Sequence, residues 1–138
     1  MTINFGEPPQ RLWVYADRRQ LVTAVFNLIE NAVKFSVVGS VVEVRARPDR
    51  DMVELSVSDQ GVGIPERDHE RIFERFYRVD HIRAGDGGGT GLGLALVRNV
   101  VDNHEGEVIV ESGEGQGSTF TLRLPAADPV PASPARAG

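Results

Sequence analysis

The sequence predicts an α/β (α+β) fold of two layers, in which a mixed, mostly antiparallel sheet is covered on one face by about three helices. Two observations predict it. Stretches that alternate apolar and polar residues come in hairpin-like pairs, and stretches with a helical repeat of apolar residues lie between them. The order strand, helix, hairpin, helices, hairpin lacks the regular alternation that a doubly wound parallel sheet requires.

The composition suits one globular domain. The chain has 138 residues, 41% hydrophobic and 25% charged, and we expect a single domain over 1–125. The tail over 126–138 is rich in Pro and Ala and has little to bury, so we expect it to be disordered. A net charge of -5 gives no general attraction to phosphate backbones, so no nucleic-acid partner is expected. The absence of cysteine excludes disulfides and thiolate metal sites.

The N-terminal segment predicts a short strand in TINF, a Pro-Pro turn and a second strand over Leu12–Tyr15. Asp17 then suits the cap of a helix over 18–35, with the Gln20 side chain reaching back to complete a capping box. Apolar side chains recur on this helix with a helical period and form one broad arc, which we expect to face the core. They are Leu21, Val22, Val25, Phe26, Leu28, Ile29, Ala32 and Val33.

The rest of the chain predicts two hairpins separated by helical and glycine-rich segments. Alternating residues over 39–61 indicate the first hairpin, with its turn at Pro48-Asp49. A helical stretch that begins at a proline follows over 65–79, and a glycine-rich loop without periodicity comes after it. A helix over 92–104 precedes the closing hairpin over 106–125.

A polar stripe interrupts the apolar residues of the first helix. Asn27, Asn31 and Lys34, the only lysine of the chain, fall within about 60° of one another at about 100° per residue. Glu30 lies beside them. Carboxamide oxygens are hard, neutral ligands that suit Mg²⁺, and a lysine ammonium can pair with phosphate oxygens. The alternative interpretation is an ordinary solvated helix face.

The segment SDQGVGIP ends a hydrophobic strand with Asp59, and Gly61 and Gly63 follow. Glycines let a flat ligand approach the backbone closely. A buried carboxylate at a strand end can accept a hydrogen bond from an exocyclic amine such as that of adenine. A turn that simply ends the strand is the alternative.

Two further glycine clusters precede regular elements. GDGGGTGLGLALV leads into a helix, where free N–H groups and the positive end of the helix dipole can cradle phosphates. It matches neither a Walker loop nor the dinucleotide spacing, and a flexible linker is the alternative. GEGQGSTF precedes a strand, and a plain hairpin turn explains it equally well.

The segment RIFERFYR places Ile72, Phe73, Phe76 and Tyr77 on one face of a helix. Aromatic stripes of this kind are usually part of the core. Where such a stripe is exposed, it forms a docking surface.

Together these segments resemble the catalytic and ATP-binding domain of bacterial sensor histidine kinases, in the GHKL superfamily that also holds gyrase, MutL and the heat-shock chaperone ATPases. NLIENAVKFS resembles the N box, DQGVGI the first glycine box and FERFYR the F box. GTGLGL and GQGSTF resemble the second and third glycine boxes. The resemblance covers residues 1 to 125 and implies the Bergerat ATP-binding fold with ATP and Mg²⁺ as cofactors.

The resemblance implies a role for each residue of the polar stripe. Asn31 would be the protein ligand of the Mg²⁺ that bridges the phosphates, and Asn27 and Lys34 would contact phosphate oxygens and assist catalysis. Glu30 would act as a base or polariser on the substrate histidine. The loop over 79–90 would be the ATP lid. The phosphate-binding end of the second glycine box would comprise Thr90, Gly91, Leu92, Gly93 and Leu94.

The resemblance also implies how the base is held. Phe35 would lie against the adenine, and Asp59 would accept from its amine with help from Thr119 through a water. The first glycine box would line the base, through Gly61, Gly63 and Ile64.

The implied function is transfer of the γ-phosphoryl group of ATP to a histidine in two-component signalling. Water-activating relatives carry a glutamate at the position of Asn27, and an amide cannot remove a proton from water, whereas a neutral imidazole is already nucleophilic. His69, His81 and His104 do not lie in a phosphoacceptor-like context, so the acceptor belongs to a separate domain. The alternatives are a GHKL-type ATPase and a nucleotide-dependent docking module.

The implied partners are the parent kinase's own dimerisation and phosphoacceptor helices, contacted through the region of Phe73, Phe76 and Tyr77, and indirectly a response regulator. The chain alone is expected to be a monomer that does not autophosphorylate. The implied location is the cytoplasmic side of a parent protein anchored in the bacterial inner membrane.

Overall fold

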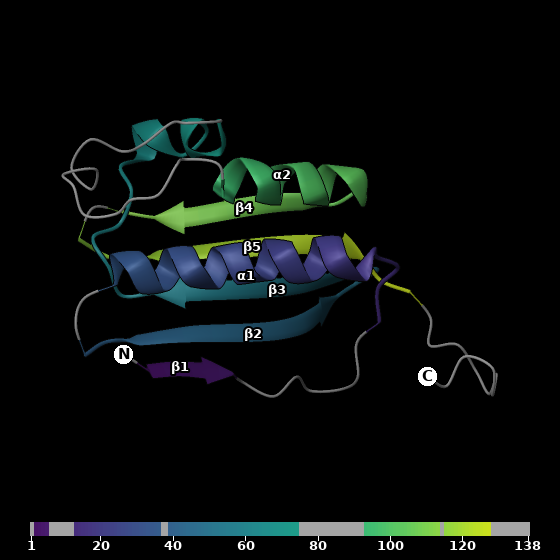
Figure 1. The fold of residues 1–138 in the computed structure, drawn as a ribbon, viewed down its shortest axis with the longest axis horizontal. Helices are drawn as coiled ribbons and strands as arrows, with labels where there is room; N and C mark the ends of the chain where they lie inside the picture. The colour runs from purple at the N-terminus through teal and green to yellow at the C-terminus, as the bar shows by residue number, and fades with distance from the viewer. Residues whose placement is uncertain (1, 6–12, 37–38, 75–92, 114, 128–138) are drawn as a thin grey trace.

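The computed structural model describes residues 2–5, 13–36, 39–74, 93–113 and 115–127. Within these ranges a five-stranded sheet carries two α-helices on one face (Figure 1). The elements are β1 (Thr2–Phe5), α1 (Arg18–Phe35), β2 (Val41–Asp49), β3 (Met52–Asp59), the 3₁₀ helices η1 (Glu66–Asp68) and η2 (Arg71–Phe73), α2 (Gly93–Asn103), β4 (Glu107–Ser112) and β5 (Ser118–Pro125). The predicted two-layer α+β fold is confirmed.

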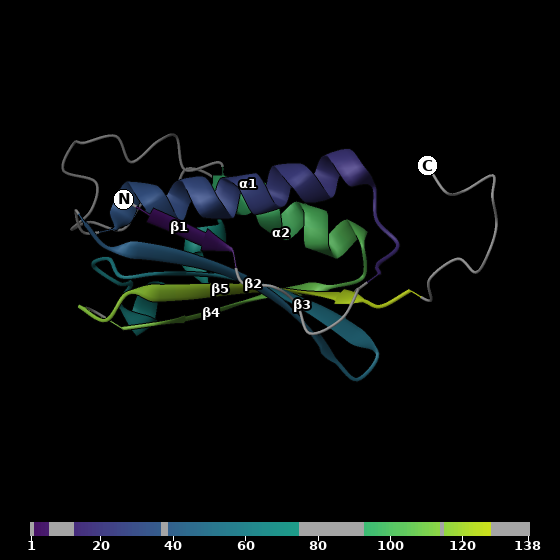
Figure 2. The same ribbon diagram turned by 90° about the horizontal axis from the view of Figure 1, so that it is seen from below.

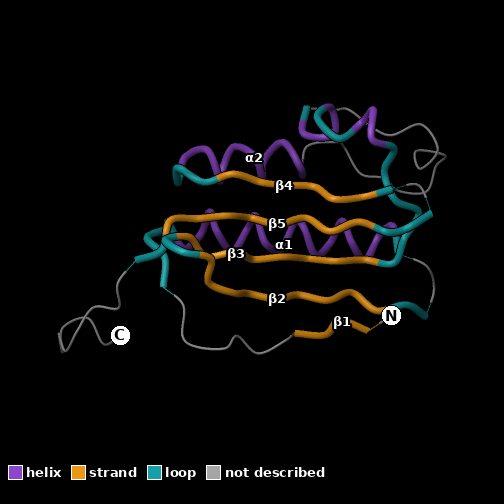
Figure 3. The backbone as a smooth tube through the Cα atoms, turned by 180° about the vertical axis from the view of Figure 1, so that it is seen from behind, coloured by secondary structure: helices purple, strands orange, loops and turns teal. Residues whose placement is uncertain are grey.

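The strands follow the order β1-β2-β3-β5-β4. β1 runs parallel to β2, and every other neighbouring pair is antiparallel, as predicted for a mixed, mostly antiparallel sheet. The ends of β3 and β4 meet the start of β5 at one edge, because Asp59 and Ser112 both lie opposite Ser118. Figure 3 shows the face of the sheet that no helix of the described residues covers.

The core lies between the two layers, which Figure 2 shows edge-on. α1 turns Ala24, Leu28 and Ala32 toward the sheet, and β5 buries alternate residues, as a period of two requires. Burying one aliphatic side chain of this kind contributes about 1.5–3 kcal/mol. The fully buried large side chains are Leu28, Leu122, Leu124, Val42, Val97 and Val101.

The apolar arc predicted for α1 is wider than the face that the fold buries. Val22 is 59% exposed and Phe26 60% exposed. They line a shallow apolar groove together with Leu21, Val25, Ile29 and Leu55. The helix is buried through Ala24, which lies outside the predicted arc, and through Leu28 and Ala32, which belong to it. Val22 and Phe26 lie about half a turn around the helix from Ala24, on its exposed side.

At the start of α1, the predicted cap by Asp17 is confirmed, but the predicted return of the Gln20 side chain is wrong. Asp17 caps the helix by accepting from the Gln20 backbone N–H at 3.1 Å. The Gln20 side chain, however, accepts from Asn103 Nδ2 at 3.3 Å instead of reaching back. The Asp17 backbone N–H donates to His104 Nε2 at 2.8 Å. Since Nε2 accepts, His104 Nδ1 carries the hydrogen and donates to the Val100 carbonyl at 2.7 Å.

We expect His104→Leu to lower the free energy of unfolding by about 1 kcal/mol, because the Asp17 N–H loses its partner and α1 its tie to α2. Asn103→Ala is the control, since it removes only the exposed bond to Gln20, which contributes little. Urea denaturation measures both variants. Equal effects of the two substitutions would contradict the importance of the histidine.

The second predicted strand, over Leu12–Tyr15, is wrong in its described part. Val14 forms only an isolated bridge to Ala126, and Leu12 lies outside the described residues.

β5 ends at Pro125, whose nitrogen has no hydrogen to continue the ladder. The Ala126 N–H donates to the Asp51 carbonyl at 2.8 Å, one residue beyond the boundary predicted at 125, which itself stays a prediction. Residues 128–138 of the predicted tail lie outside the described residues.

The first hairpin is confirmed, but its turn is displaced. Asp49 pairs with Met52, so the turn residues are Arg50 and Asp51, and Pro48 lies within β2. Arg50 has a φ of 59°, a value that the proline ring forbids. The turn therefore forms two residues after the position that the sequence predicts.

The helix predicted over 65–79 is replaced, in its described part, by the short helices η1 and η2. Ile72 and Phe73 are buried, and the Phe73 ring packs edge-on against Phe120 at 6.2 Å between centroids. Phe73 is therefore a core residue, and its predicted role in docking is wrong. Phe76 and Tyr77 lie outside the described residues.

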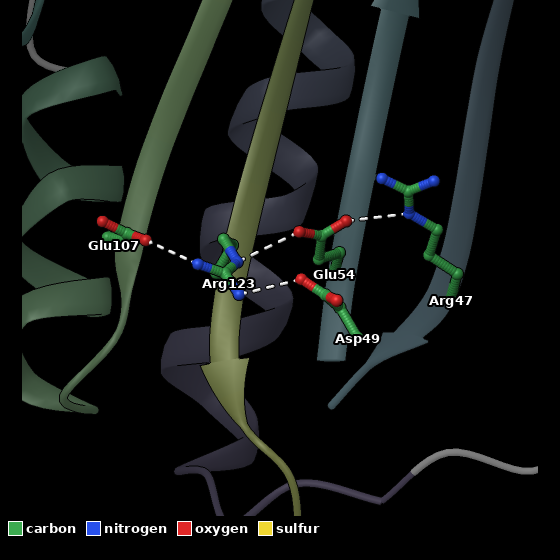
Figure 4. A network of polar contacts seen from close by, with 5 residues as sticks. All are labelled: Arg47, Asp49, Glu54, Glu107 and Arg123. Carbon is green, nitrogen blue, oxygen red and sulfur yellow. Dashed lines mark hydrogen bonds and ion pairs between the residues drawn. The ribbon is translucent and has the colours of Figure 1, made fainter. Parts of the chain in front are cut away.

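An ion network occupies the open face at the other end of the sheet from the glycine segments. Figure 4 shows Arg123 between carboxylates of three strands. Its guanidinium lies 3.0 Å from Glu107, Asp49 and Glu54, and Arg47 pairs with Glu54 at 2.8 Å. The hydrogen bond to Glu107 and the other carboxylates raise the pKa of Arg123. The network joins β2, β3, β5 and β4 by their side chains.

Candidate functional site

The candidate site lies at one end of the molecule, where α1 ends, α2 begins and three strands meet. Its first residue is Asp59, the last residue of β3. The Asp59 carboxylate accepts from the Gly61 N–H at 2.9 Å and from the backbone N–H of Ser118. Burial raises the pKa of Asp59, and these two hydrogen bonds offset part of the effect. A half-buried carboxylate with lone pairs to spare suits an N–H donor on a ligand.

Gly61 has a structural reason to be glycine that the prediction missed. A Cβ there would lie 2.1 Å from the Phe35 carbonyl oxygen, and Ser36 and Gly61 form a bridge. The close approach at Gly61 is thus between two segments of the protein, the end of α1 and the loop after β3. Phe35 and the loop that carries Gly63 and Ile64 lie near Asp59, and their contact with a base stays a prediction.

Thr119 does not lie beside Asp59. Alternate residues of β5 point to opposite faces. Ser118 and Phe120 are buried toward the helices, so Thr119 lies on the open face, where its hydroxyl is 2.9 Å from that of Ser58. The predicted assistance of Thr119 to Asp59 is therefore wrong, and Ser118 occupies that place, because a shift of one residue moves a strand side chain to the other face.

Sequence reasoning missed Ser112, which ends β4. The Ile64 N–H donates to its hydroxyl at 2.7 Å, and the hydroxyl donates to the Gly117 carbonyl at 2.9 Å. A nearby bond, from the Gly115 N–H to the Val62 carbonyl at 2.7 Å, fixes the same two loops together. A lone serine before a glycine cluster carries no signal of such a contact, because the contact depends on how the loops fold together.

The polar stripe of α1 lies next to the buried face of this helix, on the side that faces α2. The Asn27 amide nitrogen donates to the Thr23 carbonyl at 2.8 Å, which leaves its oxygen free to face the start of α2. A Cβ at Gly93 would lie 3.2 Å from that oxygen. Asn31 is half-buried one turn further on.

The other predicted residues of the phosphate side are distributed as follows. Lys34 and Glu30 are exposed on α1, which leaves them accessible to a ligand. Gly93 and Leu94 form the first turn of α2. Thr90, Gly91 and Leu92, together with the predicted lid over 79–90, lie outside the described residues.

The residues present fit a metal ion that arrives with its ligand. Among the described residues, no group of three or more His, Asp or Glu could hold a metal. The Asn31 carboxamide offers one neutral oxygen, half-buried on the stripe. Mg²⁺ is commonly bound in this way, by one or two protein oxygens together with substrate phosphates and waters.

This fold, with a half-buried carboxylate and a carboxamide stripe around its glycine-rich end, is typical of a nucleotide-binding domain. The chain matches the family of histidine kinase-, DNA gyrase B-, and HSP90-like ATPases over residues 16–128, and it belongs to that family. Within the described residues, no helix is long and apolar enough to cross a membrane.

Similar proteins narrow the class. The chain is 48% identical over 120 residues to the sensor-like histidine kinase SenX3 of Mycobacterium tuberculosis, covering 87% of this chain and 29% of SenX3. The structure of the mycobacterial sensor histidine kinase MprB is similar with a TM-score of 0.76 and 35% identity, over 92% of this chain and 84% of that one. Full-length ShkA in complex with AMPPNP is similar with a TM-score of 0.81 and 30% identity, over 94% of this chain and 26% of ShkA. The chain is the ATP-binding catalytic domain of a sensor histidine kinase.

Proposed function

We propose that this domain binds Mg·ATP and transfers the γ-phosphoryl group to a histidine on the dimerisation and phosphoacceptor domain of its parent kinase. One observation carries the proposal. The Gly61–Phe35 contact joins the Asp59 end of the sheet to the α1 stripe that holds Asn27 and Asn31. This contact supports the proposal that the base acceptor and the phosphate ligands form one continuous site. The AMPPNP complex of ShkA supports an adenine nucleotide as the ligand.

In this proposal the chain's own residues bind and orient the nucleotide. The Asp59 carboxylate accepts from the exocyclic amine of adenine, and Phe35 lies against the ring. Asn27 and Lys34 contact phosphate oxygens, and Asn31 contributes an oxygen to the metal. When bound, Mg²⁺ neutralises charge on the phosphates. Catalysis of this kind rests mainly on positioning and electrostatic stabilisation.

The transfer step needs no activated water. An imidazole nitrogen of the acceptor forms a bond to the γ-phosphorus, and the bond from that phosphorus to the β–γ bridging oxygen breaks, so that ADP leaves. The proton on the other ring nitrogen passes to a base, for which we propose Glu30, an exposed carboxylate beside the stripe. A response-regulator aspartate is the later acceptor. We also propose that the domain lies on the cytoplasmic side of a parent kinase anchored in the bacterial inner membrane.

An ATPase of the gyrase kind is the second candidate, because the family includes such enzymes. It requires a side chain that removes a proton from water. The amide of Asn27 cannot do so, which favours transfer to histidine.

Titration of the chain with a fluorescent adenine nucleotide, with and without Mg²⁺, tests the proposal. We expect Mg²⁺ to tighten binding of the triphosphate by about tenfold or more in the wild type, and Asn31→Ala to remove most of that gain, because a metal ligand is lost. Asn103→Ala, at the far end of α2, is the control. No dependence on Mg²⁺ in the wild type would contradict the metal's role. Rapid ATP hydrolysis by the chain alone would favour the ATPase.

A further inference from the structure

The hydroxyl of Ser112 joins three groups from two loops. The Ile64 N–H donates to it at 2.7 Å, it donates to the Gly117 carbonyl at 2.9 Å, and its oxygen lies 2.8 Å from the Ser118 hydroxyl. Ile64 belongs to the loop after β3, whereas Gly117 ends the turn before β5 and Ser118 is the first residue of β5. Ser112 therefore fixes the two loops that flank Asp59.

The count of hydrogens determines the direction of each bond. A serine hydroxyl has one hydrogen, and that of Ser112 goes to the Gly117 carbonyl, which can only accept. The Ser118 hydroxyl must therefore donate to Ser112. With its hydrogen used in this way, the Ser118 oxygen can only accept from any third group.

Two acceptors then lie next to each other at this end of the sheet. Ser118 lies directly opposite Asp59 in the pairing of β3 and β5, and its backbone N–H already donates to the Asp59 carboxylate. The carboxylate and the Ser118 oxygen are left to receive hydrogen bonds from a ligand. Such a pair favours a ligand edge that carries an amine and disfavours one that carries a carbonyl, which would leave acceptors facing each other.

We propose that Ser112 is a positioning residue that holds the Asp59 loop in place and keeps Ser118 an acceptor, so that the site selects a base with an exocyclic amine over one with a carbonyl. The inference rests on the proposed nucleotide-binding function. Ser112 acts through Ile64, Gly117 and Ser118 without touching the ligand.

Competition titrations with ATP and GTP against a fluorescent adenine nucleotide test this proposal. We expect Ser112→Ala to weaken ATP binding by about tenfold and to reduce the preference for ATP over GTP by a similar factor, because Ser118 becomes free to donate. Ser112→Thr keeps the hydroxyl and should restore both quantities.

Ser58→Ala is the matched control. It also removes a serine hydroxyl bonded to a neighbouring strand, at the residue before Asp59, but on the opposite face of the sheet. We expect it to leave ATP affinity and the ATP preference unchanged, even where it lowers the melting temperature as much as Ser112→Ala does. If Ser112→Ala does not fold, Ser112→Cys takes its place. The thiol is a weaker donor and acceptor than the hydroxyl, so this variant should show the same changes in affinity and preference to a smaller extent.

The outcomes separate the inference from the function on which it rests. In the first outcome the wild type binds ATP, but Ser112→Ala (or Ser112→Cys in its place) matches Ser58→Ala within twofold in ATP affinity and in the preference for ATP over GTP. Ser112 then has only a structural role, and the inference is overturned. If the wild type binds neither nucleotide, the proposed function fails and the inference fails with it. A selective loss of the ATP preference that Ser112→Thr restores supports the inference.

Discussion

Replacement of Asp59 by Asn should weaken binding of an adenine nucleotide by about 10- to 100-fold, because a charged acceptor at the end of β3 is lost and hydrogen bonds to charged groups contribute about 1.5–3 kcal/mol. Without nucleotide, the free energy of unfolding of the variant should fall by less than its binding free energy does. Burial raises the pKa of Asp59, so the charged carboxylate costs free energy in the folded state. Nucleotide titration and thermal unfolding of both proteins measure the two effects. A variant that binds like the wild type would place the base elsewhere.

The same residue predicts opposite pH trends for stability and for binding. Its folded pKa lies above the ordinary value of 3.8, so the stability it contributes is fully present below 3.8 and is lost as the pH rises through the folded pKa. Nucleotide affinity should instead fall as the pH falls through that pKa, because a protonated carboxyl is a poorer acceptor. Asp59→Asn should remove both trends, and parallel pH profiles of wild type and variant would contradict this.

Gly117→Ala should be among the most destabilising single substitutions in the closing turn, with a loss of about 2–4 kcal/mol in the free energy of unfolding. Gly117 has a φ of 75°, and a Cβ there would lie 2.2 Å from the Asp59 carbonyl oxygen, a backbone atom that cannot rotate away. Nucleotide affinity should fall as well, since the clash displaces Asp59.

Gly115→Ala in the same turn is the matched control. Its φ is 77°, but a Cβ there would meet nothing within 4 Å. It should therefore cost only the left-handed conformation, about 1 kcal/mol, and leave nucleotide affinity unchanged. Urea denaturation compares the two variants, and equal losses would show that the close approach at Asp59 has no energetic weight.

Local signals in the sequence were enough to predict α1, α2 and the five strands of the sheet, but not the short helices η1 and η2. The bounds of α1 follow from Asp17 as a cap and from the helical period of its apolar residues. The two hairpins follow from alternation. The turn at Arg50 was misplaced because Pro48 is a strong turn former in isolation, whereas the pairing of the strands decides which residues remain for the turn.

Local sequence patterns could not predict the contacts between segments that are distant in the sequence. Ser118 and Thr119 are adjacent hydroxyl residues, and only the register of β3 against β5 decides which one lies beside Asp59. The Gln20 side chain could not be assigned to Asn103, which follows 83 residues later. Ser112 gains its role from loops that meet only in the folded domain.

The backbone contact between Gly61 and Phe35 bears on the thermodynamics of ligand capture. Because the segments that we propose to hold the base and the phosphates are already in contact at this point, a nucleotide should spend little free energy on bringing them into alignment. We therefore expect that calorimetry, when it compares an adenine nucleoside with its triphosphate, finds only a small heat-capacity change and a small entropy penalty from this part of the surface.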